Sequence, residues 1–66
     1  MYLSINGKSR DFPAPLNVVQ LLESLKLGPE RVVVELNREI LTVDKHAGIQ
    51  LQDGDTLELI QFVGGG

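Results

Sequence analysis

Alternation of apolar and polar residues predicts a β-hairpin at the start of the chain. Residues 2–5 form a short strand in which every second residue is apolar. Asn6 and Gly7 follow, and both tolerate the positive φ that a two-residue hairpin turn requires. Residues 8–12 then return as a more polar strand. Charged residues suit the edge of a sheet, so we expect this strand to lie there.

A helix is predicted next, and its start is the clearest local signal in the sequence. Asn17 is a good N-cap, and Gln20 stands three residues later, as a capping box requires. The spacing i, i+3, i+4, i+7 predicts one apolar stripe made of Val18, Leu21, Leu22 and Leu25. Gly28 is expected to cap the end of the helix, and Pro29 to prevent its continuation.

Strand signals dominate the second half of the chain. Residues 31–37 alternate, and residues 40–43 are a further short apolar run. Residues 44–52 have no clear period and predict a loop containing a helical turn. Asp53-Gly54-Asp55 is a strong turn signal, and residues 56–63 form the last predicted strand.

The order of these elements is strand, strand, helix, strand, short strand, strand. This order predicts an α+β fold in which one main helix packs across one face of a mixed sheet of four to five strands. We find no internal repeat and no second domain. Residues 1–63 are predicted to form one domain, and residues 64–66 a flexible glycine tail.

The last strand has apolar residues on both of its faces. Leu57 and Leu59 point one way, so Ile60 and Phe62 should point the other. Either the strand is central and partly buried on both sides, or a bulge changes where its side chains point. The alternative is an exposed docking patch of Ile60, Phe62 and Val63, because contiguous exposed apolar surface often marks a partner site.

Composition excludes several classes of function. Cysteine is absent and His46 is the lone histidine, which excludes disulfides and thiolate metal sites and argues against zinc. A net charge of −3 has the wrong sign for neutralising nucleic-acid phosphates. No apolar run is long enough for a membrane span, and no signal-peptide pattern opens the chain. We therefore expect a small cytoplasmic protein with an exposed, non-catalytic His46, which acts through a partner.

Three glycines follow the last predicted strand. Gly64, Gly65 and Gly66 lack side chains, so they could thread a channel that any Cβ would block and present the carboxylate of Gly66. A carboxylate is a poor electrophile until adenylation turns it into a mixed anhydride that thiols or persulfides can attack. The chain has neither a phosphate-cradling G-x-x-x-x-G-K motif nor a catalytic cysteine. A separate ATP-using enzyme would have to supply the activation and the sulfur.

Four segments together resemble the ThiS family of sulfur carriers in thiamine biosynthesis. They are residues 5–8 (INGK), 17–22 (NVVQLL), 34–40 (VELNREI) and 52–66 (QDGDTLELIQFVGGG). The resemblance covers essentially the whole chain and implies the ubiquitin-like β-grasp fold. The departure lies in residues 41–45, which lack a Pro-Arg pair expected in many members.

The resemblance also implies a role for the tail and a set of partners. An E1-like enzyme, ThiF, would adenylate Gly66 with ATP, and a cysteine desulfurase would provide persulfide sulfur. The resulting thiocarboxylate would give its sulfur to thiazole synthase, ThiG. Gly65 and Gly66 correspond to the reactive diglycine of the family, with Gly64 as an additional glycine. The chain itself would be a monomer with no bound cofactor and no enzymatic activity.

Three alternatives remain open from the sequence. MoaD, the small subunit of molybdopterin synthase, shares the fold and the diglycine thiocarboxylate. A ubiquitin-like modifier would instead join its tail to a lysine through an isopeptide bond. A β-grasp binding module could end in glycines by chance, and it would then keep its function when Gly66 is replaced.

Overall fold

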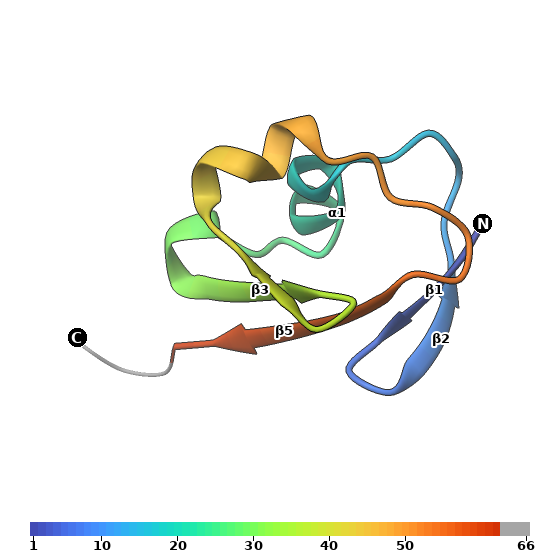
Figure 1. Ribbon diagram of the computed structural model, residues 1–66, viewed down its shortest axis with the longest axis horizontal. Helices are drawn as coiled ribbons and strands as arrows, with labels where there is room; N and C mark the ends of the chain where they lie inside the picture. Colours follow the sequence, from blue (N-terminus) through green and yellow to red (C-terminus); the bar gives the residue numbers. More distant parts are fainter. Residues whose placement is uncertain (63–66) are drawn as a thin grey trace.

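The computed structural model describes residues 1–62, which form one mixed sheet with helices on one of its faces (Figure 1). The strands are β1 (Tyr2–Ile5), β2 (Lys8–Asp11), β3 (Val32–Leu36), β4 (Glu39–Leu41) and β5 (Thr56–Gln61). The helices are α1 (Val18–Ser24) and two 3₁₀ helices, η1 (Pro29–Arg31) and η2 (Val43–Gly48). α1 and η2 contact each other on the same side of the sheet.

The sheet has the strand order β2-β1-β5-β3-β4. β1 and β5 are parallel neighbours near its centre, and the other neighbouring pairs are antiparallel. The last strand of the chain therefore lies between strands from the two halves of the sequence. β2 is an edge strand and all four of its residues are exposed, as its polar sequence predicted. The predicted α+β class, with one main helix on a mixed sheet, is confirmed.

Two hairpin turns have the backbone that two-residue hairpins require. Asn6 and Gly7 have φ of 52° and 82°, which confirms the predicted turn between β1 and β2. Asn37 and Arg38 have φ of 49° and 72° in the turn between β3 and β4. Asparagine tolerates this left-handed region better than other residues with a Cβ, whereas Arg38 adopts it without that advantage.

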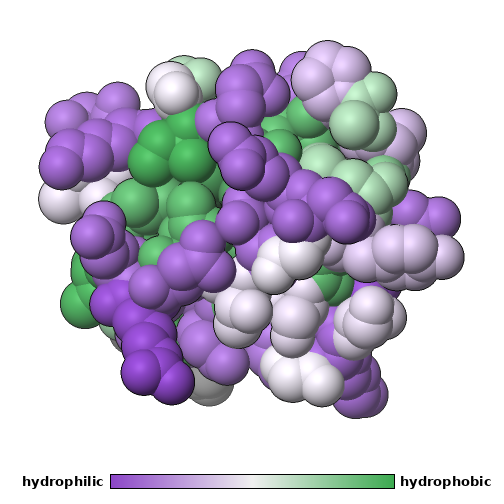
Figure 2. Space-filling view, turned by 45° about the vertical axis from the view of Figure 1, so that its right-hand side comes forward, coloured by the Kyte–Doolittle hydropathy of each residue, from purple (hydrophilic) through white to green (hydrophobic). Residues whose placement is uncertain are grey.

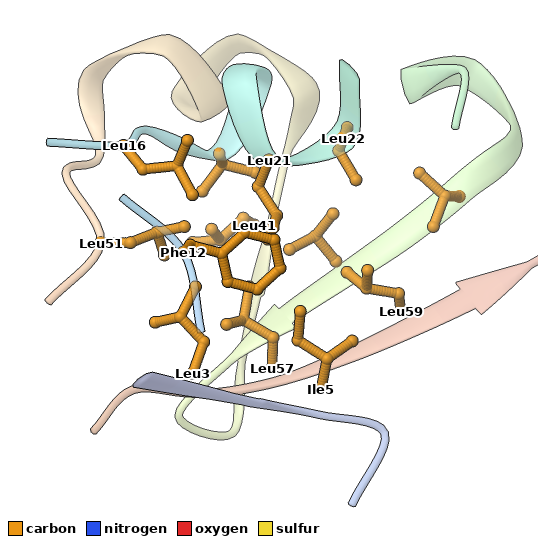
Figure 3. Packing of buried hydrophobic residues seen from close by; sticks show 13 residues of the cluster. Leu3, Ile5, Phe12, Leu16, Leu21, Leu22, Leu41, Leu51, Leu57 and Leu59 are labelled. Atoms are coloured by element: carbon orange, nitrogen blue, oxygen red, sulfur yellow. The ribbon is translucent and has the colours of Figure 1, made fainter. Parts of the chain in front are cut away.

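The hydrophobic core lies between the sheet and α1 (Figure 3). Leu57 and Leu59 of β5 point into it, as their alternation predicted. The helix contributes Val18, Leu21 and Leu22, so three of the four residues of its predicted stripe are buried. The whole buried cluster comprises Leu3, Ile5, Phe12, Leu16, Val18, Leu21, Leu22, Val32, Val34, Leu41, Leu51, Leu57 and Leu59.

The two ends of α1 differ in how well the sequence predicted them. The capping box is confirmed: the Gln20 N–H donates to Asn17 Oδ1 at 2.8 Å, and the Asn17 N–H donates to Gln20 Oε1 at 2.9 Å. The predicted Gly28 cap is wrong. Lys26 takes the left-handed conformation with φ of 60°, and the next N–H, of Leu27, donates to the Leu22 carbonyl at 2.9 Å. Gly28 has φ of −76° and instead precedes η1.

The segment after β4 is more ordered than predicted. It contains the six-residue helix η2, and His46 in this helix is only 1% exposed. The expectation of an exposed histidine is therefore wrong, because η2 packs against α1 and encloses the imidazole. Both ring nitrogens of His46 are buried and have no hydrogen-bond partner among residues 1–62. Within residues 1–62, no helix is long and apolar enough to cross a membrane.

Candidate functional site at the end of β5

The start of β5 is fixed by side chains of the turn before it and of the turn between β3 and β4. Asp53 Oδ1 accepts a hydrogen bond from the Tyr2 N–H at 2.6 Å, which joins the preceding turn to β1. Asn37 Oδ1 accepts from the Thr56 N–H at 3.0 Å, and Asn37 Nδ2 donates to Asp55 Oδ1 at 3.0 Å. The two aspartates around Gly54 are therefore occupied in structural hydrogen bonds.

The later part of β5 is held mainly from one side. Its antiparallel ladder with β3 extends from Leu36↔Leu57 to Val32↔Gln61. The parallel ladder with β1 ends sooner, at Ile5↔Leu57. One further backbone hydrogen bond extends this pairing by a residue: the Phe62 N–H donates to the carbonyl of Arg31, the residue before β3, at 2.9 Å. The strand thus keeps an ordered position up to the residue that precedes Val63.

Ile60 and Phe62 are exposed although β5 is an inner strand of the sheet. Their exposed fractions are 52% and 60%. The interpretation that burial on both faces explains these apolar residues is therefore wrong, because α1 and η2 cover only one face. Alternation continues without a bulge, since the register with β3 is unbroken. Val63 of the predicted patch, and Gly64 to Gly66, lie outside the residues that the structure describes.

The two exposed side chains have different surroundings. Ile60 lies on the outer face of the sheet, directly opposite the half-buried Val33 of β3. Phe62 lies at the end of the strand and lines a shallow groove with Lys26 and Gly28. The apolar surface therefore extends around the end of the sheet rather than along one flat face. Val33 was missed as a member of this surface, because its position opposite Ile60 depends on the register between distant strands.

A second apolar feature lies between α1 and η2. It is a groove of about 170 Å³ lined by Val19, Leu22, Glu23, Leu27, Pro29, Val43 and His46. Figure 2 shows one face of the molecule, on which the largest group of hydrophobic residues lies at the left of the view and is bordered by hydrophilic ones. Near this groove, the Thr42 side chain hydrogen-bonds to Asp44 and lowers the pKa of that exposed carboxyl group. No cluster of three or more metal-ligating side chains is found within residues 1–62.

The geometry at the end of β5 supports binding rather than catalysis. The described residues offer exposed apolar side chains on a well-anchored strand, and the glycine sequence follows directly. A model of the ThiS family matches residues 3–66, which includes the strand and all three glycines. The chain belongs to the ThiS family. This membership confirms the resemblance to the ThiS family of sulfur carriers.

Individual relatives agree with the family assignment. The sulfur carrier protein ThiS of Bacillus subtilis is 37% identical over 65 residues, which are 97% of this chain and 98% of that protein. A thiazole synthase of Paramagnetospirillum magneticum is 42% identical over all 66 residues. A thiazole synthase of Magnetococcus marinus is 32% identical over the same length. The chain spans about a fifth of the length of both thiazole synthases, which are 20% covered.

A solved structure supports the fold as well. The crystal structure of the thiamine biosynthesis protein ThiS from Geobacter metallireducens superposes with a TM-score of 0.84 at 40% identity. The match covers 100% of both chains. The predicted β-grasp fold is thereby confirmed, including the five-stranded mixed sheet and its single main helix.

Proposed function

We propose that this chain carries sulfur for thiazole formation in thiamine biosynthesis, as a thiocarboxylate on Gly66. The observation that carries the proposal is the family match through residue 66. It is supported by the near full-length similarity to a protein named as a sulfur carrier. Gly64 and Gly65 would let the last residue enter a narrow active site of a partner, because glycine has no side chain to obstruct it.

The chemistry needs a partner at each step. The Gly66 carboxylate attacks the α-phosphorus of ATP in an E1-like enzyme of the ThiF type, and pyrophosphate leaves. A persulfide sulfur from a cysteine desulfurase attacks the acyl adenylate, and AMP leaves. A thiol then cleaves the sulfur–sulfur bond by reduction, which leaves the thiocarboxylate on Gly66 and a disulfide. ATP is thus a cosubstrate of the activating enzyme, and this chain holds no cofactor of its own.

The exposed end of β5 is the proposed docking surface for these enzymes. Ile60 and Phe62 are more than half exposed on a strand whose position is fixed by β3. An anchored strand limits where the following residues can reach, so docking here would direct Val63 and the glycines toward the partner's active site. The protein would work as a cytoplasmic monomer that binds its partners in turn.

Thiazole synthase of the ThiG type is the proposed acceptor of the sulfur. Support comes from two thiazole synthases that contain a segment similar to this whole chain. A carrier and an acceptor that occur in one polypeptide are expected to act on each other, because the linkage raises their effective concentration. We infer that this chain makes the same encounter with its acceptor.

The test is intact mass spectrometry after incubation with ATP, the activating enzyme, a cysteine desulfurase and cysteine. We expect the mass change of one oxygen replaced by one sulfur, located at Gly66 by fragmentation. The Gly66→Ala variant should load little or no sulfur while its thermal unfolding remains that of the parent. Gly48→Ala is the matched control, since a Cβ at Gly48 has open space around it.

The alternatives give different products in the same experiment. Isopeptide-linked lysine adducts without a thiocarboxylate would indicate a ubiquitin-like modifier. Sulfur transfer to a molybdopterin precursor but not to thiazole synthase would indicate a MoaD-like role. Normal loading of Gly66→Ala would overturn the carrier assignment of Gly66. An unchanged mass, with partners active on a control carrier, would favour a plain binding module.

A further inference from the structure

Two glutamates face each other on the outer surface of the sheet. Glu35 of β3 and Glu58 of β5 are directly opposite in the antiparallel ladder. Their faces are set by their neighbours, since Val34 and Leu57 point into the core on the other side. Residues directly opposite in such a ladder have Cβ atoms about 5 Å apart, which is close enough for their charges to interact.

This arrangement is unfavourable in the free protein. Like charges placed directly opposite each other destabilise a sheet. Within residues 1–62, the salt bridge that forms joins the N-terminal ammonium to Asp11, and neither glutamate takes part in one. Glu35 is also half-buried as a residue, whereas Glu58 is exposed. The pair therefore favours any partner that brings a positive charge.

Apolar side chains lie on two sides of the two carboxylates. Ile40 of β4 lies opposite Glu35 and is 68% exposed. Two residues after Glu58 along β5, Ile60 lies opposite Val33 on the same face. A partner that covers this surface would remove water from around the glutamates, which strengthens their attraction to a cation. Arginine suits this setting better than lysine, because its planar guanidinium is weakly hydrated and can bond two carboxylates at once.

We propose that the outer face of β3, β4 and β5 docks the adenylating partner through an arginine of that enzyme placed between Glu35 and Glu58. Ile40 and Ile60 would pack against apolar residues around this arginine. The proposal rests on the proposed function, since it names the chemistry by which the activating enzyme recognises the carrier. It extends the docking surface from the end of β5 across three strands.

The test compares binding of variants of the 66-residue chain to the purified adenylating enzyme by isothermal titration calorimetry. Glu35→Gln and Glu58→Gln should each weaken binding about tenfold or more, and they should reduce its dependence on salt. The double variant should lose less affinity than the product of the two single fold-losses, because both carboxylates share one guanidinium. Glu39→Gln is the matched control, since it makes the same charge change in β4, opposite Leu36 on the other side of the sheet.

Thermal unfolding separates binding from stability. Both glutamine variants should melt at the parent's temperature or above it, because the substitution removes a repulsion. Arginine modification of the enzyme by phenylglyoxal should block binding, and peptide mapping should find one arginine that the parent carrier protects and the double variant does not. The proposal would be overturned if Glu35→Gln and Glu58→Gln bound the enzyme as tightly as Glu39→Gln, if either variant had a lowered melting temperature, or if the parent carrier protected no arginine. Sulfur loading of the parent, measured separately, reports on the proposed function and not on this arginine.

Discussion

The side chain of Asn6 pairs with the backbone of Leu59 as a neighbouring strand would. Asn6 Oδ1 accepts from the Leu59 N–H at 2.8 Å, and Asn6 Nδ2 donates to the Leu59 carbonyl at 3.3 Å. The Asn6 N–H also donates to the Leu57 carbonyl at 3.0 Å. Since the β1–β5 ladder ends at Ile5↔Leu57, this amide extends the support of β5 by two residues. The first turn of the chain thus helps to position its last strand.

Removing this side chain should loosen the end of β5. The variant Asn6→Gly keeps a residue that tolerates the positive φ, so it tests the amide rather than the turn. Two net hydrogen bonds predict a loss of about 1–2 kcal/mol in the free energy of unfolding. Hydrogen exchange at the Leu59 amide should accelerate more than exchange at Val34. Unchanged exchange at Leu59 would show that β3 alone holds the strand.

A residue with a left-handed backbone conformation at the end of α1 offers a substitution that should stabilise the protein. Lys26 is exposed and has φ of 60°, a conformation that glycine adopts at little cost. Lys26→Gly should therefore raise the free energy of unfolding by up to about 1 kcal/mol, as strain relief outweighs the added freedom of the unfolded chain. Urea denaturation measures this, with Lys45→Gly in η2 as a control that should not stabilise. A less stable Lys26→Gly would mean that the lysine stem contributes packing.

The sequence predicted those features of the fold that neighbouring residues determine. Asn17 and Gln20 specify the start of α1 through bonds between themselves, and Asn6-Gly7 specifies a turn by backbone preference. The end of α1 was placed at Gly28 because glycine is the usual cap. The helix ends earlier, since Leu27 must turn toward the core, where it is partly buried. That choice depends on tertiary packing, which a local pattern does not contain.

The directions of side chains along β5 could be predicted from the sequence, but the residues that lie opposite them on neighbouring strands could not. Alternation along β5 correctly placed Leu57 inward and Ile60 outward. The position of Ile60 opposite Val33, and of Glu35 opposite Glu58, depends on the register between β3 and β5. The paired residues are more than 20 positions apart in the sequence. His46 was misjudged for the same reason: the surroundings of an irregular segment are set by α1, which packs against it.

Replacing His46 by an apolar residue should stabilise the protein. Its two ring nitrogens are buried and find no hydrogen-bond partner in the part of the chain that the structure describes, and each such group costs about 1–3 kcal/mol. Leucine has a similar volume and no polar atoms, so His46→Leu should raise the free energy of unfolding by about 1–2 kcal/mol. Thermal and urea denaturation of both proteins at neutral pH measure the change. His46→Asn, which keeps polar atoms in a smaller side chain, should destabilise, and a stability loss in His46→Leu would show that the imidazole is needed there.

Phe62→Asp should separate docking from folding. Phe62 is 60% exposed beyond the last core residue of β5, so a carboxylate there keeps its contact with water and should change the free energy of unfolding by less than about 0.5 kcal/mol. Binding to the activating enzyme should weaken by about tenfold or more, because an apolar anchor is replaced by a charge that must be desolvated. Calorimetric titration measures the affinity, and Val43→Asp in η2, exposed by 57%, is the control that should bind normally. A collapse of thermal stability in Phe62→Asp would place this side chain in the core, and equal affinities for the two variants would exclude it from the docking surface.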